Sequence, residues 1–130
     1  MRGVNDDEWG RLVEYAWSLG ALPRFIELMP LGEGKKVEQR RVESDEVLRA
    51  LGLQPASGAP GGAAHGPARY VQGAGGKVGF ISPLSHNFCD DCNRLRINAR
   101  GDIRACLADR QAVSLRDVLR TGGSDADVGW

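Results

Sequence analysis

Three cysteines offer the clearest chemistry in this sequence. Cys89 and Cys92 are separated by two residues, and Cys106 follows with thirteen residues in between. Two thiolates on one tight turn and a third from a strand are a ligand set that can close on one metal centre. An odd number of clustered cysteines does not suit a disulfide framework, and the first ten residues contain no apolar core of a signal peptide. We therefore expect reduced thiolates in a cytoplasmic protein.

The cysteine spacing alone leaves three readings open. Cys-x2-Cys turns most often bind zinc, and His86 is then available as a fourth ligand beside the three thiolates. An iron–sulfur cluster on three cysteines is the second reading, and its fourth iron is open to a substrate. In the third reading the cysteines are unrelated buried thiols that bind nothing.

A predicted hairpin places basic side chains beside Cys106. Residues 94–98 and 102–107 flank Ala99-Arg100-Gly101, a three-residue loop with Gly101 in the left-handed position. With a three-residue loop, the residue numbers of two facing residues add up to an even number, so odd-numbered residues face odd-numbered ones. Leu95 and Ile97 therefore share an apolar face with Ile103, Ala105 and Leu107. The opposite face then carries Arg94, Arg96, Asn98, Arg104 and Cys106. Positive charge beside a thiolate-bound metal suits an anionic ligand.

Helices and strands with an α/β order precede this hairpin. Trp9, Leu12, Val13 and Ala16 recur on one helix face, and Gly20 is a suitable C-cap. Further along we expect a short buried strand over 24–29, a charged loop over 35–41, a helix from Ser44, a strand over Lys77–Ile81 and a last helix capped by Ser114. The residues before the first helix, 1–4, resemble the end of an apolar strand.

Composition limits the classes of function. Seventeen basic and seventeen acidic residues cancel, which excludes a nucleic-acid binder that works by bulk charge. No apolar run approaches the ~18 residues of a membrane span. Residues 53–69 are rich in Gly, Ala and Pro and predict a connector. We therefore expect one α/β segment over 1–52 and a smaller module over 70–130 that holds all three cysteines.

Five motifs in this order resemble one family. They are MRGVND at 1–6, RFIELMPLG at 24–32, GFISP at 79–83, FCDDCNRLR at 88–96 and GDIRACL at 101–107. Together they are similar to molybdenum cofactor biosynthesis protein A, the family of radical S-adenosylmethionine GTP 3′,8-cyclases. The resemblance implies an α/β fold in which 1–52 form the last strand–helix units of a partial (β/α)6 radical-SAM barrel. Residues 70–130 would form a small α+β module for an auxiliary cluster.

The resemblance also implies a site. Cys89, Cys92 and Cys106 match the three ligands of the family's auxiliary [4Fe-4S] cluster, whose open iron contacts the guanine of GTP. Arg94, Leu95 and Arg96 match its GTP-binding residues, and Met29 matches a methionine that lines the S-adenosylmethionine site. The implied reaction converts GTP to (8S)-3′,8-cyclo-7,8-dihydroguanosine 5′-triphosphate, the first step toward molybdopterin. The product would pass to cyclic pyranopterin monophosphate synthase, and a homodimer is possible.

The sequence also departs from the family pattern. The Cys-x3-Cys-x2-Cys motif of the cluster that cleaves S-adenosylmethionine is not in these residues, and neither is a C-terminal Gly-Gly tail. We therefore expect the C-terminal part of a cyclase, inactive on its own. The rival interpretations are a zinc-binding structural module and the auxiliary-cluster part of another radical enzyme. The Arg-x-Arg that follows Cys92 argues against the latter.

Overall fold

The computed structural model describes residues 1–54, 67–92, 94–109 and 111–128. Most of the expected connector, 55–66, therefore lies outside the described residues. Contacts divide the chain into two units, Met1–Cys92 and Asn93–Trp130. This division falls at the second cysteine rather than at the connector, and each unit is described here by itself.

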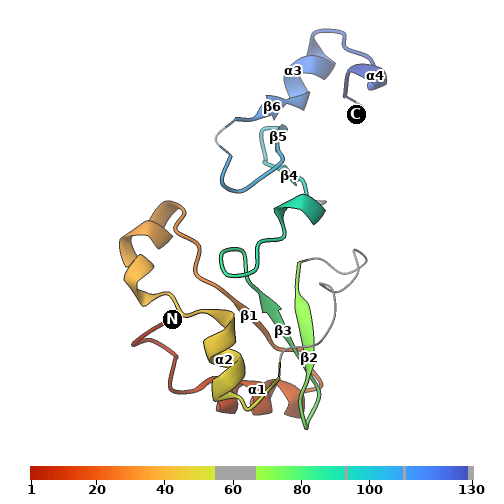
Figure 1. Cartoon of the computed structure of the whole chain (residues 1–130). Coiled ribbons are helices and arrows are strands. Elements are labelled where there is room, and N and C mark those ends of the chain that lie inside the picture. The colour runs from red at the N-terminus through yellow and green to blue at the C-terminus, as the bar shows by residue number, and fades with distance from the viewer. Residues whose placement is uncertain (55–66, 93, 110, 129–130) are drawn as a thin grey trace. The chain divides into compact units, whose positions relative to one another are not determined.

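The first unit is built on a three-stranded sheet with the order β1-β3-β2 (Figure 1). Strand β1 (Arg24–Ile26) pairs in parallel with β3 (Lys77–Ile81), and β2 (Arg69–Gln72) pairs antiparallel with β3. The sheet is therefore mixed, and it joins residues on both sides of the expected connector.

The core of the first unit lies between this sheet and two helices, α1 (Trp9–Ser18) and α2 (Ser44–Ala50). The buried apolar side chains of this core are Trp9, Val13, Val42, Val47, Leu48, Val71, Val78 and Phe80. Central strand β3 supplies the most enclosed pair, Val78 and Phe80. The apolar face predicted for the first helix is confirmed by the burial of Trp9 and Val13, although Leu12 stays partly exposed.

The C-cap predicted at Gly20 is confirmed by its backbone. Gly20 has φ +67° and donates its N–H to the carbonyl of Trp17, while the Ala21 N–H bonds to the carbonyl of Ala16. These two bonds form a Schellman motif, which needs the left-handed conformation that glycine adopts without strain.

Three local expectations for the first unit are wrong. Residues 2–7 form turns rather than the end of a strand, and the expected loop at 35–41 lies mostly in a 3-10 helix, η1 (Gly32–Arg40). The strand expected to be buried over 24–29 ends at Ile26, which is 65% exposed. One more backbone bond follows, from the Glu27 N–H to the Ile81 carbonyl at 3.0 Å, and β3 itself ends at Ile81.

The second unit contains a small antiparallel sheet and two short helices. Its strands are β4 (Arg96–Ile97), β5 (Asp102–Arg104) and β6 (Val113–Ser114), in the order β4-β5-β6. Helix α3 (Leu115–Arg120) begins where Ser114 Oγ accepts the Asp117 N–H at 3.2 Å, as predicted, and α4 (Asp125–Val128) follows.

The predicted hairpin register is confirmed. Arg96 faces Arg104 and Ile97 faces Ile103, so the index sum is even and Ala99-Arg100-Gly101 form the loop. Gly101 has φ +81°, as the loop requires. Asn98 holds the turn through Oδ1, which accepts the N–H groups of Arg100 at 2.8 Å and Asp102 at 3.1 Å.

The apolar face of this hairpin does not form the expected core. Leu95 is 53% exposed and Ile97 64%, and Leu107 and Val113 are also exposed. None of residues 94–109, 111–124, 126 and 127 is buried. The sequence predicted correctly which side chains share a face of the hairpin. Their burial also needs a second apolar layer packed against that face, and the described part of this unit supplies none. No described helix in either unit is long and apolar enough to cross a bilayer.

Candidate functional site

Cys89 and Cys92 lie on one short turn at the end of the first unit. Cys89–Asp91 form a 3-10 turn, η3, and the Cys92 N–H donates to the carbonyl of Cys89 at 3.2 Å. The Asn87 side chain begins the turn, because its Oδ1 accepts the Cys89 N–H at 2.7 Å. Both cysteines are exposed, which contradicts the reading of the cysteines as buried thiols.

The segment that leads to this turn is held by side chains from distant elements. The Leu84 and Ser85 N–H groups donate to Glu27 Oε2 at 3.3 and 3.1 Å. His86 donates its N–H to the Ser82 carbonyl at 3.1 Å, and its Nε2 lies 3.2 Å from Oδ1 of Asp45 in α2. His86, the fourth ligand in the zinc reading, thus has one ring nitrogen engaged with a carboxylate.

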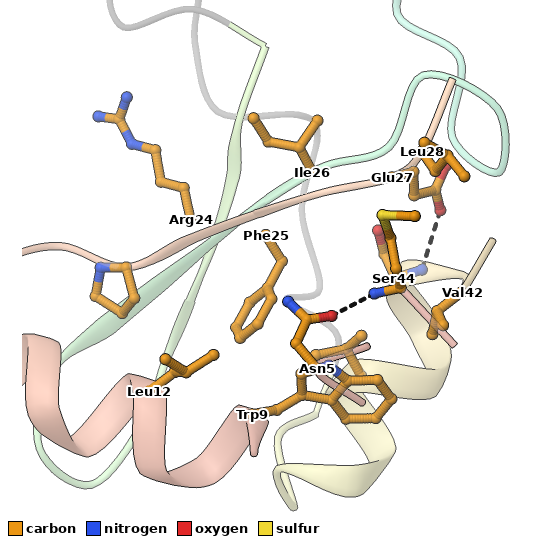
Figure 2. A pocket seen from close by; sticks show the side chains of 13 residues that line it. Asn5, Trp9, Leu12, Arg24, Phe25, Ile26, Glu27, Leu28, Val42 and Ser44 are labelled. Atoms are coloured by element: carbon orange, nitrogen blue, oxygen red, sulfur yellow. Dashed lines mark hydrogen bonds between the residues drawn. The ribbon is translucent and has the colours of Figure 1, made fainter. Parts of the chain in front are cut away.

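Glu27 is the charged residue at the centre of these contacts, and the sequence analysis did not single it out. It follows β1, its side chain is 4% exposed, and Oε1 accepts the Ser44 N–H at 3.0 Å and the Ser85 hydroxyl. Figure 2 shows its carboxylate pointing toward Ser44 at the start of α2. The available signal was a lone acidic residue within the apolar run 24–29.

The carboxyl group of Glu27 is held in its ionised form. Burial by itself raises its pKa, but hydrogen bonds from the Ser85 hydroxyl and from the Ser44, Ser85 and Leu84 amides outweigh burial and bring the pKa below its ordinary value. The Ser44 amide also belongs to the first turn of α2, where the helix dipole favours a negative charge. No salt bridge to Glu27 occurs among the described residues, so N–H and O–H donors alone balance this charge.

Cys106 lies in the second unit, just beyond β5. Its thiol is exposed, and Sγ accepts the Ala108 N–H at 3.4 Å. The Cys106 carbonyl accepts the Asp109 N–H at 3.3 Å, so the chain turns around the sulfur. A backbone N–H aimed at sulfur stabilises a thiolate and tunes a metal centre bound to it.

The arginines expected to bind an anion lie in the same unit. Arg96 and Arg104 are directly opposed across β4 and β5, and Arg94 lies two residues before Arg96, one strand period away. Like charges directly opposed across two strands are destabilising without an anion near them. In the described part of the chain, neither Arg96 nor Arg104 forms a salt bridge. Leu95, between the first two arginines, is exposed.

Met29 lies three residues beyond β1 and is half-buried. A cavity of about 450 Å³ opens between β1, α1 and α2, lined by Trp9, Leu12, Phe25 and Glu27 among others (Figure 2). Met29 and the cysteines do not line this cavity. The expected S-adenosylmethionine contact of Met29 therefore does not fall in this cavity.

The described residues do not assemble a complete metal site. No three His, Cys, Asp or Glu side chains among them come close enough to hold one ion. Cys89 and Cys92 belong to the first unit and Cys106 to the second. The donor chemistry nevertheless fits a thiolate-bound centre, because all three cysteines are exposed and the Cys106 sulfur already accepts an N–H bond.

Comparison with known proteins identifies the family. Residues 23–128 match the family described as Molybdenum Cofactor Synthesis C. This chain belongs to that family. The match spans Met29, the three cysteines and the three residues from Arg94 to Arg96, and it confirms the resemblance that the five motifs predicted.

Curated relatives extend this match to nearly the whole chain. A GTP 3′,8-cyclase of Heliobacterium modesticaldum is 45% identical over 96% of this chain and 40% of its own length. The proteins of the same name from Syntrophomonas wolfei and Paracoccus denitrificans are 38% and 39% identical over 98% of the chain. This Molybdenum Cofactor Synthesis C chain therefore spans about 40% of the length of these relatives.

Proposed function

We propose that this chain is the C-terminal part of a GTP 3′,8-cyclase and that it carries the auxiliary cluster and part of the GTP site of that enzyme. The observation that carries the proposal is the 45% identity to a GTP 3′,8-cyclase over 96% of the chain. GTP is then the substrate, and the cyclised nucleotide passes to cyclic pyranopterin monophosphate synthase.

The cluster ligands in this proposal are Cys89, Cys92 and Cys106. The exposure of all three cysteines and the N–H donated to the Cys106 sulfur support it. When bound, a [4Fe-4S] cluster with three cysteines offers one iron that is open to a donor atom of the substrate. The chain's own part is to supply the three thiolates and to keep a basic surface near Cys106.

The nucleotide-binding residues in this proposal are Arg94, Leu95 and Arg96. A guanidinium is always charged and presents a planar fork that matches phosphate and other anionic oxygens in two parallel hydrogen bonds. The unpaired state of Arg96 among the described residues leaves that fork free for a ligand. Met29 is proposed to contact S-adenosylmethionine in the longer enzyme.

The test is anaerobic reconstitution with iron and sulfide, followed by metal and sulfide analysis. We expect about four irons per chain, visible absorption, and a sharp loss of iron in Cys89→Ser, Cys92→Ser and Cys106→Ser. Asp90→Asn, an exposed change between the first two cysteines, is the matched control and keeps its iron. Stoichiometric zinc in place of iron would instead support the zinc-binding structural module.

A second measurement separates the chain from the complete reaction. This chain contains no Cys-x3-Cys-x2-Cys motif, so with S-adenosylmethionine and a reductant it should form no 5′-deoxyadenosine above background. The reconstituted chain should still bind GTP. Radical cleavage by the pure chain would show that the assignment of roles is wrong.

A further inference from the structure

Glu27 connects three separate parts of the first unit. Its carboxylate accepts the Ser44 N–H at 3.0 Å, the Leu84 N–H at 3.3 Å, the Ser85 N–H at 3.1 Å and the Ser85 hydroxyl. Ser44 begins α2, and the 84–85 segment follows β3, so these donors lie 17, 57 and 58 residues from Glu27 in the sequence. A buried carboxylate with four donors and only 4% exposure is costly to remove, since each donor loses its acceptor.

The donors on the 84–85 segment lead directly to the cysteine turn. Leu84 and Ser85 precede Cys89 by five and four residues. Between Ser85 and the turn, His86 contacts Asp45 of α2, and the Asn87 side chain accepts the Cys89 N–H. The bonds from Leu84 and Ser85 to Glu27 and the contact of His86 with Asp45 are all partly buried, and Glu27 accepts three of the bonds that hold this segment.

We propose that Glu27 is a positioning residue for the cysteine turn, which orders residues 84–88 and thereby presents Cys89 and Cys92 in one fixed geometry. The effect of Glu27 on a bound cluster rests on the proposed function, whereas its effect on the order of residues 84–88 in the metal-free chain does not. The chemistry suits this role, because two carboxylate oxygens can satisfy four converging donors that no single neutral side chain can satisfy.

Glu27→Gln is the direct test, because it keeps the shape and removes one acceptor oxygen. In either orientation of the amide, its NH₂ group takes the place of one carboxylate oxygen and faces the two groups that donate to that oxygen. In the metal-free chain we expect backbone amides of residues 84–92 to exchange with deuterium at least about tenfold faster, the change that ~1.4 kcal/mol of local opening free energy gives. Ser85→Ala, which removes only the hydroxyl donor, should give a smaller acceleration in the same segment if Glu27→Gln proves too unstable to measure.

Two controls separate positioning from general destabilisation. Glu43→Gln makes the same chemical change at an exposed carboxylate beside α2 and should leave exchange in the 84–92 segment unchanged. Val13→Ala weakens the core of the same unit from α1, and it should accelerate exchange across the unit without singling out that segment. Uniform acceleration in Glu27→Gln, or none, would overturn the proposal.

The reconstituted chain supplies the second readout. Below the melting temperature of each variant, Glu27→Gln should release iron to a chelator severalfold faster and broaden the electron paramagnetic resonance signal of the reduced cluster, whereas Val13→Ala should not. If the parent chain takes up no cluster, the proposed function fails and the exchange experiment still decides the role of Glu27. If the cluster signal and iron release are the same in Glu27→Gln and parent, Glu27 does not position the ligands.

Discussion

The opposed pair Arg96 and Arg104 predicts that stability and nucleotide affinity move in opposite directions. These residues face each other across β4 and β5, where Cβ atoms of paired residues are about 4.5–5.5 Å apart. Arg104→Glu turns a repulsive pair into an attractive one. Cross-strand charge pairs contribute about 0.2–1 kcal/mol, so the reversal should raise the free energy of unfolding of the second unit by about 0.5–1.5 kcal/mol at low salt. The gain should shrink at high salt, because both side chains are accessible to solvent.

The same substitution should weaken GTP binding. It places a carboxylate opposite Arg96, where it competes for the guanidinium that the proposal assigns to the nucleotide; a charged hydrogen bond of this kind is worth about 1.5–3 kcal/mol. We expect a loss of about ten- to a hundredfold in affinity by calorimetric titration of the reconstituted chain. Arg100→Glu is the matched control: it makes the same change in net charge on the same hairpin, but in the loop, away from the pair.

A double-mutant cycle completes the test. Arg96→Glu alone should stabilise the unit as Arg104→Glu does, and the double substitution should lose that gain because it restores a like-charge pair. The reasoning is refuted if Arg104→Glu melts at the same temperature as Arg100→Glu at low salt. It is refuted equally if Arg104→Glu binds GTP like the parent chain.

Three further changes test the remaining structural arguments. Glu27→Gln should lower the free energy of unfolding at pH 7 by about 1–3 kcal/mol for each of two orphaned donors. The pKa of Glu27 is lower in the folded chain than in the unfolded chain, where it is about 4.3. The loss of unfolding free energy in Glu27→Gln should therefore be complete above about pH 4.3 and shrink as the pH falls below it. Urea unfolding at pH 7 and pH 3.5 measures this loss. Gly75→Ala places a Cβ in a clash with Trp17 Cε3 and should cost about 1–3 kcal/mol in thermal melts, whereas Gly10→Ala, with open space around it, should not destabilise. Leu95→Ala should change stability by less than about 0.5 kcal/mol, and a loss of several kcal/mol would mean that its exposed face is covered.

Features set by neighbouring residues were predictable from the sequence. The Gly20 cap, the Ser114 cap and the three-residue loop ending at Gly101 all depend on contacts within a few residues. The pairing of Arg96 with Arg104 followed from the period of two along a strand together with the loop length. Family membership was also readable, because its five motifs occur in one order.

Burial and the division into units were not predictable in the same way. The alternation of Leu95 and Ile97 defined an apolar face correctly, but whether that face is covered depends on what packs against it. Likewise, the Gly/Ala/Pro-rich stretch suggested a boundary, yet β3 on its far side pairs with β1. Pairing between strands far apart in sequence is decided by the whole sheet and has no local signal.

The sequence by itself determined the chemical types at the candidate site: three thiolates, an Arg-x-Arg and their spacing. Only the tertiary structure decided how the first two thiolates are presented. Glu27 is one acidic residue in an apolar run until folding brings the amides of Ser44, Leu84 and Ser85 to its carboxylate. Burying that charge is favourable only when all these donors converge on it, and their convergence requires β1, β3 and α2 to be in place together.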